Sequence, residues 1–121
     1  MVLGQIFNKN LIHEVIHKLV ENNLLNDMRF AEMYTLARKN KGFGPKKIFY
    51  ELLTKGLLES DINAAIDHEG EWEAIAQKVF KKKYPNGKSE DTKTTLKQKN
   101  FLINRGFSFK EIESVFTNDM V

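Results

Sequence analysis

The sequence of 121 residues contains no cysteine, only two prolines and no long apolar run. Without cysteine, a disulfide scaffold and thiol catalysis are both excluded, and the composition fits a reducing compartment. A membrane-spanning helix needs about 20 consecutive apolar residues, and no segment approaches that length. Residues 1–9 are too short and too interrupted by polar residues for a signal peptide. We therefore expect a cytoplasmic protein that does not enter a membrane.

The sequence does contain an internal repeat. Lys55-Gly56-Leu57 recurs as Arg105-Gly106-Phe107, 50 residues later (106 − 56). Apolar residues follow each glycine at the same offset, namely Ile62 and Ile66 in one copy and Ile112 and Phe116 in the other. A fixed period of this length is typical of tandem structural repeats.

Each repeat is predicted to contain three helices. Helix boundary signals occur throughout, and no alternating strand pattern is found, so we predict an all-α fold. Ile12 and Ile16 align with Ile62 and Ile66, which indicates the third helix of an incomplete first repeat. The expected array is curved and elongated, with residues 1–26 as the truncated first repeat, 27–71 as the second and 72–121 as the third.

Local signals predict where the helices begin and end. In the first helix of the second repeat, Asn26-Asp27 is expected to cap the start, and the buried face is expected to be Phe30, Met33, Tyr34 and Ala37. Pro45 suits the first position of the next helix. The glycines at 56 and 106 are expected to be left-handed helix stops. Helix caps are expected from Ser60 in one repeat and from a Ser108–Glu111 capping box in the other.

Charge is distributed unevenly along the chain, although the net charge is only +3. Residues 28–56 carry seven basic and two acidic residues, and residues 57–77 carry six acidic residues and no Lys or Arg. Residues 78–105 then carry nine basic and two acidic residues. Two basic segments therefore flank an acidic one.

Some of the basic positions repeat between the two units. Lys47 and Lys55 recur as Lys97 and Arg105, on second helices that we expect to lie side by side, and a periodic basic ridge suits phosphate groups. A solvated surface is the commoner explanation of such lysines, and Lys81, Lys82 and Lys83 also complement the dipole at a helix end. The candidate binding residues are Arg29, Arg38, Lys39, Lys46, Lys47, Lys55, Lys97 and Arg105.

An ordered set of short motifs resembles one protein family. The motifs are Asn23-Leu-Leu-Asn-Asp27, Arg29-Phe30-Ala31, Gly42-Phe43-Gly44-Pro45, Lys55-Gly56-Leu57 and Arg105-Gly106-Phe107-Ser108. Together, over residues 11–116, they resemble the bacterial RecX regulators of the RecA recombinase. The resemblance implies a monomer without enzymatic activity or cofactor. It is expected to bind the RecA filament on single-stranded DNA, to inhibit the recombinase and thereby to modulate homologous recombination and the SOS response.

A different motif points to another chemistry. His13-Glu14-Val15-Ile16-His17 matches the H-E-x-x-H signature, in which two imidazoles hold zinc and the glutamate activates water. Only His68 remains as a third histidine, and Val20 stands where the metzincin extension requires glycine. The histidines also align with polar positions of the other repeats, so we interpret them as solvent-facing rather than as metal ligands.

Three functions are therefore compared. The first is a non-enzymatic regulator of the RecA filament, and the second is a helical module that binds DNA without a protein partner. The third and weakest is a zinc peptidase. A filament regulator should inhibit RecA's DNA-dependent ATP hydrolysis at concentrations far below those at which it binds naked DNA.

Overall fold

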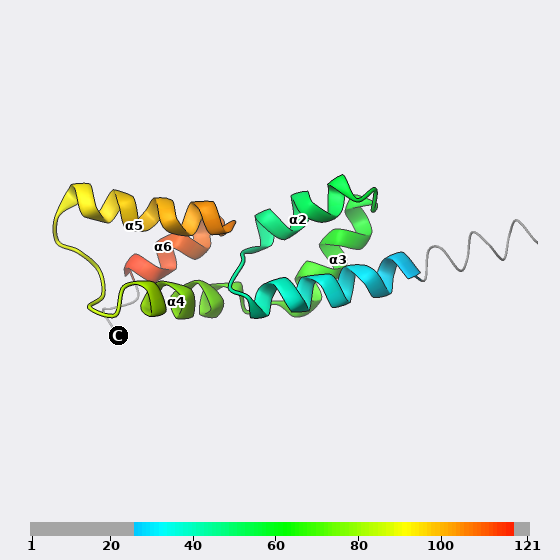
Figure 1. The fold of residues 1–121 in the computed structure, drawn as a ribbon, viewed down its shortest axis with the longest axis horizontal. Helices are drawn as coiled ribbons and strands as arrows, with labels where there is room; N and C mark the ends of the chain where they lie inside the picture. The colour runs from blue at the N-terminus through cyan, green and yellow to red at the C-terminus, as the bar shows by residue number, and fades with distance from the viewer. Residues whose placement is uncertain (1–25, 118–121) are drawn as a thin grey trace, which may run out of the picture.

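The computed structural model describes residues 26–117, which form helices joined by turns and contain no strand within that range. A helix over 26–40 is followed by α2 (Pro45–Thr54), α3 (Glu59–Glu69), α4 (Trp72–Lys83), α5 (Thr92–Arg105) and α6 (Phe109–Thr117). Figure 1 shows an elongated molecule in which one group, the helix over 26–40 with α2 and α3, is followed along the long axis by a second group, α4 with α5 and α6. None of these helices is long and apolar enough to cross a membrane.

The first three-helix group, formed by the helix over 26–40 with α2 and α3, encloses its own apolar core. Ile48 and Leu52 of α2 and Ile62 of α3 are completely buried there. Trp72, the first residue of α4, is buried in the same core, and its Nε1–H donates to the Ile66 carbonyl at 3.0 Å. The second group therefore begins by closing the core of the first.

The second group, α4 to α6, repeats this packing. Its core residues Leu102, Phe107 and Ile112 are buried and stand 50 positions after core residues of the first group. Gln98 takes the place of an apolar residue, yet its side chain is satisfied. The Gln98 amide accepts from Ser89 N–H at 3.1 Å and donates to the Gly87 carbonyl at 3.2 Å, which fixes the loop before α5.

The buried face of the helix over 26–40 differs from the sequence prediction. Phe30 is 43% exposed and Met33 is 72% exposed, whereas Ala31 and Thr35 are completely buried. The predicted face is therefore wrong for Phe30, Met33 and Ala37, and only Tyr34 packs against the core. The physical reason is close approach, because the small side chain of Ala31 lets the helix lie directly on the core. Its equivalent in α4, Ala76, is also completely buried.

Most predicted helix ends are confirmed. Pro45 is the first residue of α2. Gly56 and Gly106 have φ angles of 90° and 98°, in the left-handed region that other residues avoid. At the start of α6, Ser108 N–H donates to Glu111 Oε1 at 2.8 Å, and Glu111 N–H donates to Ser108 Oγ at 3.4 Å. This reciprocal pair is the predicted capping box.

Two predicted caps are wrong. The helix before α2 already includes Asn26 and Asp27, so these residues do not cap it. Helix α3 begins at Glu59 after Leu58, which makes no side-chain cap, and Ser60 lies inside the helix. The reason is the repeat itself, since the residue 50 positions before Ser108 is Leu58 rather than Ser60.

The two groups meet end to end through α5 and α2. Gly44 N–H donates to the Arg105 carbonyl at 2.8 Å, and Lys46 N–H donates to the Gly106 carbonyl at 2.9 Å. The free N–H groups at the start of α2 and the free carbonyls at the end of α5 thus satisfy one another, with the two helix dipoles aligned. The expectation that the second helices lie side by side is therefore wrong, as Figure 1 also shows.

Candidate nucleic-acid and filament interface

Three cationic side chains surround the ring of Phe43, in the turn before α2. The Arg38 guanidinium lies 3.9 Å from the ring centroid, the Arg105 guanidinium 4.8 Å and the Lys47 ammonium 5.6 Å. They come from the helix over 26–40, from α5 and from α2, so both three-helix groups contribute. Cations are attracted to the face of an aromatic ring, and the Phe43 ring therefore gathers positive charge at the junction. We call Arg38, Lys47 and Arg105 the Phe43 cluster.

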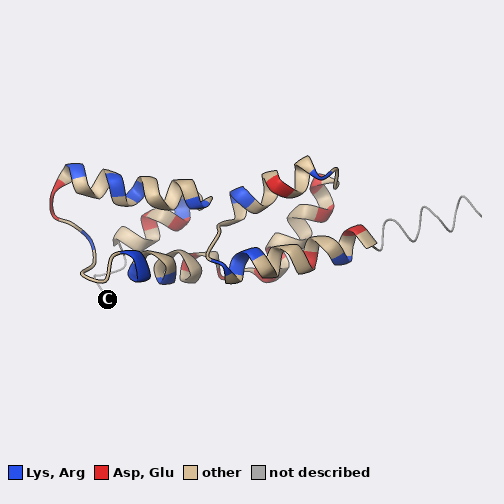
Figure 2. Cartoon of the chain, viewed as in Figure 1, with Lys and Arg blue, Asp and Glu red and all other residues tan. Residues whose placement is uncertain are grey.

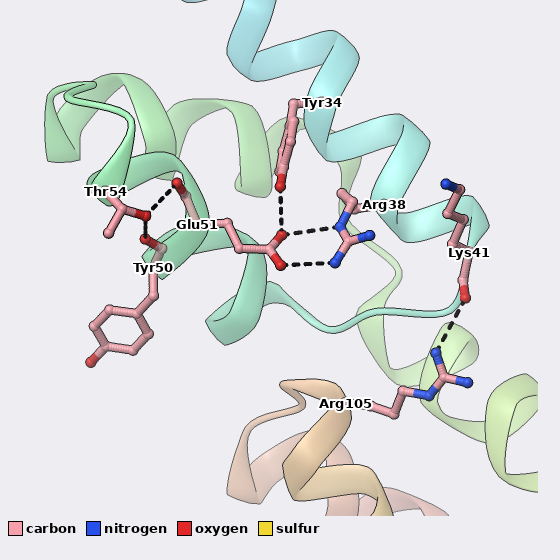
Figure 3. A network of polar contacts seen from close by, with 7 residues as sticks. All are labelled: Tyr34, Arg38, Lys41, Tyr50, Glu51, Thr54 and Arg105. Carbon is pink, nitrogen blue, oxygen red and sulfur yellow. Dashed lines mark hydrogen bonds and ion pairs between the residues drawn. The ribbon is translucent and has the colours of Figure 1, made fainter.

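Arg38 is held in this cluster by a polar network. Its Nε and Nη2 donate to the two carboxylate oxygens of Glu51 at 3.0 and 2.8 Å. The Tyr34 hydroxyl donates to the same carboxylate at 2.8 Å (Figure 3). The two hydrogen bonds between Arg38 and Glu51 fix the plane of the guanidinium group, so Glu51 positions Arg38. The carboxylate also neutralises the charge of Arg38.

The same network shifts two pKa values. Burial acts to raise the pKa of the Glu51 carboxyl, but hydrogen bonds from Arg38 and Tyr34 outweigh it, and the pKa is lower than its ordinary value. Burial raises the pKa of the Tyr34 hydroxyl, and its hydrogen bond to Glu51 raises it further. At neutral pH the carboxyl is therefore ionised and the hydroxyl is protonated, which are the forms that the network requires.

Two further candidate residues make contacts within the first group. Lys39 Nζ lies 3.3 Å from a carboxylate oxygen of Glu69 and donates to the Glu69 carbonyl at 3.2 Å. Lys55 Nζ lies 5.5 Å from the centroid of the Tyr34 ring. Lys39 therefore connects the helix over 26–40 to the end of α3, and the charge of Lys39 is largely balanced by Glu69.

The remaining candidates are distributed over the surface. Arg29, Lys46 and Lys97 are exposed, and none of them forms an ion pair within residues 26–117. Figure 2 shows the Lys and Arg residues spread along α5 and clustered at the carboxyl end of α4. The structure thus brings Arg38, Lys47 and Arg105 together and does not join Arg29 or Lys97 to them.

A basic pocket lies beside the junction of the two groups, and the sequence does not predict it as a site. It has a volume of about 430 Å³ and lies between the end of the first helix, α4 and α5. Its cationic lining residues are Lys39, Lys41, Lys78, Lys82, Lys83 and Arg105. Lys78 and Lys82 are one helical turn apart, a spacing visible in the sequence. Their approach to Lys41 and Arg105 depends on tertiary packing and has no local signal.

The H-E-x-x-H motif lies outside the described residues. Its interpretation as a solvent-facing sequence therefore stays a prediction. The third histidine considered for a zinc site, His68, is exposed on α3. Within residues 26–117, no group of three histidine or carboxylate side chains is placed to hold a metal ion.

Fold and site together define an all-α tandem-repeat protein with a cationic surface at the junction of two three-helix units. Family models described as the second and third three-helix domains of RecX match residues 26–66 and 69–116. The chain belongs to the RecX family.

Individual relatives agree with these matches. The chain is 32% identical over 99 residues to the "Regulatory protein RecX" of Pectobacterium atrosepticum, covering 81% of this chain and 61% of the relative. It is 33% identical over 111 residues to that of Yersinia pseudotuberculosis, covering 91% and 61%. With the protein of Pseudomonas entomophila it shares 33% over 103 residues, covering 84% and 66%. The chain therefore spans about three-fifths to two-thirds of the length of these relatives.

Proposed function

We propose that this chain binds the RecA filament on single-stranded DNA and inhibits the recombinase, acting as a monomer and without catalysis or a cofactor. The observation that carries the proposal is the match of both three-helix groups to consecutive RecX domains. The relatives named above are called regulatory proteins. The RecA recombinase is the target that the resemblance to the RecX regulators implies. The cationic junction supports the proposal because a filament on DNA is rich in negative charge.

The Phe43 cluster is the centre of the proposed binding surface. Arg38 is neutralised by Glu51, so Lys47 and Arg105 supply most of the free charge there. Their positions depend on both three-helix groups, because α5 ends where α2 begins. A partner that binds this surface contacts both groups at once. Arg29, Lys39, Lys46, Lys55 and Lys97 extend the proposed surface along the molecule.

The second candidate function is direct binding to DNA with no protein partner. The basic pocket favours it, because six cationic residues line one concave site. The two functions predict different potencies. A filament regulator uses contacts to RecA as well as to DNA, so it should act on the filament at concentrations where naked DNA stays unbound.

Titration of the chain against both targets tests the proposal. RecA hydrolysis of ATP on single-stranded DNA is measured with increasing chain, and binding to the same DNA without RecA is measured in the same buffer. We expect half-inhibition at a concentration about tenfold or more below half-binding of naked DNA, since only the filament offers both sets of contacts. Equal potency would favour the DNA-binding module, and no inhibition would refute the proposed function.

A further inference from the structure

The basic pocket contains a concentration of positive charge that the protein does not balance. Among residues 26–117, no aspartate or glutamate lines it. Lys39 is paired with Glu69, but Lys41, Lys78, Lys82, Lys83 and Arg105 form no ion pair in the described part of the chain. A concave site lined by one sign of charge concentrates the electrostatic field and attracts counter-ions. The pocket therefore favours an anion with several charges.

Helix dipoles do not account for this arrangement. Lys82 and Lys83 lie in the last turn of α4, where cations are favourable, and so does Lys81. Lys78 lies before that turn and Lys41 lies beyond the end of its helix, yet both line the pocket, whereas Lys81 does not. The lysines that line the pocket therefore share their orientation toward it. They do not share a position at a helix end.

Comparison of the two repeats shows why the Lys83 ammonium of the pocket has no carboxylate partner within residues 26–117. In the first group, Arg38 is paired with Glu51 of α2. Phe101 of α5 stands 50 residues after Glu51, and Lys83 stands 45 residues after Arg38. In the second group, therefore, a phenyl ring replaces the carboxylate, and the Lys83 ammonium lies 5.8 Å from its centroid. The second group therefore has no carboxylate at this position and has an aromatic ring in the pocket instead.

The aromatic ring is held in a defined orientation. Tyr84 packs against Phe101 edge to face, with ring centroids 5.8 Å apart, and the Arg105 guanidinium lies 5.5 Å from the Phe101 centroid. Phe101 is partly exposed, and Ile75 and Val79 supply apolar surface beside it. An anion that also carries a flat ring could stack there, as bases of single-stranded nucleic acids stack on protein aromatics.

We propose that the basic pocket binds one nucleotide of a single-stranded DNA, with its phosphates on Lys41, Lys78, Lys82 and Arg105 and its base against Phe101. The pocket volume of about 430 Å³ suits a group of that size. This inference deepens the proposed function by naming the site for the strand. It is tested without RecA, so failure to inhibit RecA and failure to bind DNA here are separate results.

Fluorescence anisotropy with a labelled oligothymidylate tests the site. The variant Lys78→Gln/Lys82→Gln removes two pocket charges, and Lys81→Gln/Lys93→Gln removes two exposed charges that do not line the pocket. All four lysines are exposed, so both variants should fold, as circular dichroism would verify. We expect the pocket variant to weaken binding about fivefold or more at low salt and to flatten the log–log salt dependence by roughly 0.7 per lost contact. The control should change little.

A second variant separates stacking from charge. Phe101→Leu keeps an apolar side chain but removes the ring, so we expect affinity to fall about fivefold or more with an unchanged salt slope. Equal losses for the pocket variant and its lysine control, or wild-type affinity of Phe101→Leu, would overturn the proposal.

Two competitors identify the source of the ligand. Free thymidine triphosphate should displace the oligonucleotide only weakly, because it lacks the neighbouring phosphates of a strand, which we expect to contact exposed cations outside the pocket such as Lys97. An acidic peptide of equal charge should do the same, because it has no ring to stack. Displacement by the triphosphate as effective as that by unlabelled oligonucleotide would assign the pocket to free nucleotides, and effective displacement by the peptide would assign it to a protein partner. Either result would contradict a strand site.

Discussion

The ionisation of Glu51 makes the free energy of unfolding depend on pH. Its pKa in the folded protein lies below the ordinary value of 4.5. The folded state therefore favours the ionised form, and this contribution is present above pH 4.5 and is lost as the pH falls through the folded pKa. The Arg38–Glu51 pair is partly buried, with side-chain exposures of 22% and 25%, so its effect should exceed that of a fully exposed pair.

We therefore predict that Glu51→Gln lowers the free energy of unfolding by about 1 kcal/mol at neutral pH. In strongly acidic solution Glu51 itself is protonated, so the difference between the variant and the wild type should disappear. Urea titrations at both pH values measure this. Glu32→Gln, at an exposed position without an ion pair in residues 26–117, should show no such dependence. A pH-independent loss in Glu51→Gln would contradict the assigned role.

Thr35 gives a second residue-scale prediction. Its side chain is completely buried, and its Oγ1 has no hydrogen-bond partner in the described structure. A buried hydroxyl without a partner costs free energy. Thr35→Val replaces it with a methyl group of similar shape and should raise the free energy of unfolding by about 1 kcal/mol. Thermal and urea unfolding would test this, and a destabilised variant would indicate that the hydroxyl is satisfied.

At the scale of helices, contact between α5 and α2 depends on glycine. A Cβ atom added at Gly44 would overlap the carbonyl group of Gly106, although the Gly44 backbone has an ordinary φ of −90°. A Cβ added at Gly56 would meet no atom of the described residues within 4 Å, although its φ is 90°. The two positions therefore separate the effect of close approach from the effect of backbone strain.

We predict that Gly44→Ala destabilises the protein by roughly 1–3 kcal/mol through overpacking and uncouples the two groups. Trp72 fluorescence reports the first core, and far-UV circular dichroism reports all helices. The two urea transitions should coincide in the wild type and separate in Gly44→Ala. Gly56→Ala should cost about 1 kcal/mol from its left-handed backbone alone, with coincident transitions. Coincident transitions in Gly44→Ala would show that this contact does not couple the groups.

The elements that the sequence predicts well are those with local causes. Pro45 at a helix start, left-handed glycines at helix ends and the Ser108–Glu111 box each depend on a few neighbouring residues. The buried face of the first helix was predicted wrongly because Phe30 and Ala31 are adjacent. Only tertiary packing decides whether the large or the small side chain faces the core. The end-to-end meeting of α5 and α2 has no signal within either helix.

At the scale of the whole molecule, the candidate site was predictable only in part. The recurrence of basic residues between the repeats indicates Lys47 and Arg105 as binding residues, and the structure places both beside Phe43. The sequence alone assigns Lys82 and Lys83 to the end of a helix, where they complement the helix dipole. The structure shows them facing a pocket shared by three elements, a relation that no spacing along the chain encodes.

The central claim is that this chain inhibits RecA through the cationic surface that extends along the molecule from the junction of its two groups. It is tested most directly by RecA-catalysed ATP hydrolysis on single-stranded DNA. Lys47→Gln/Lys97→Gln is compared with Lys93→Gln/Lys110→Gln, which removes the same charge from exposed positions outside the proposed surface. We predict that the first variant needs about fivefold or more protein for half-inhibition with unchanged thermal stability, whereas the second matches the wild type. Wild-type inhibition by both variants would contradict the proposed surface, and absence of inhibition by the wild-type chain would contradict the proposed function itself.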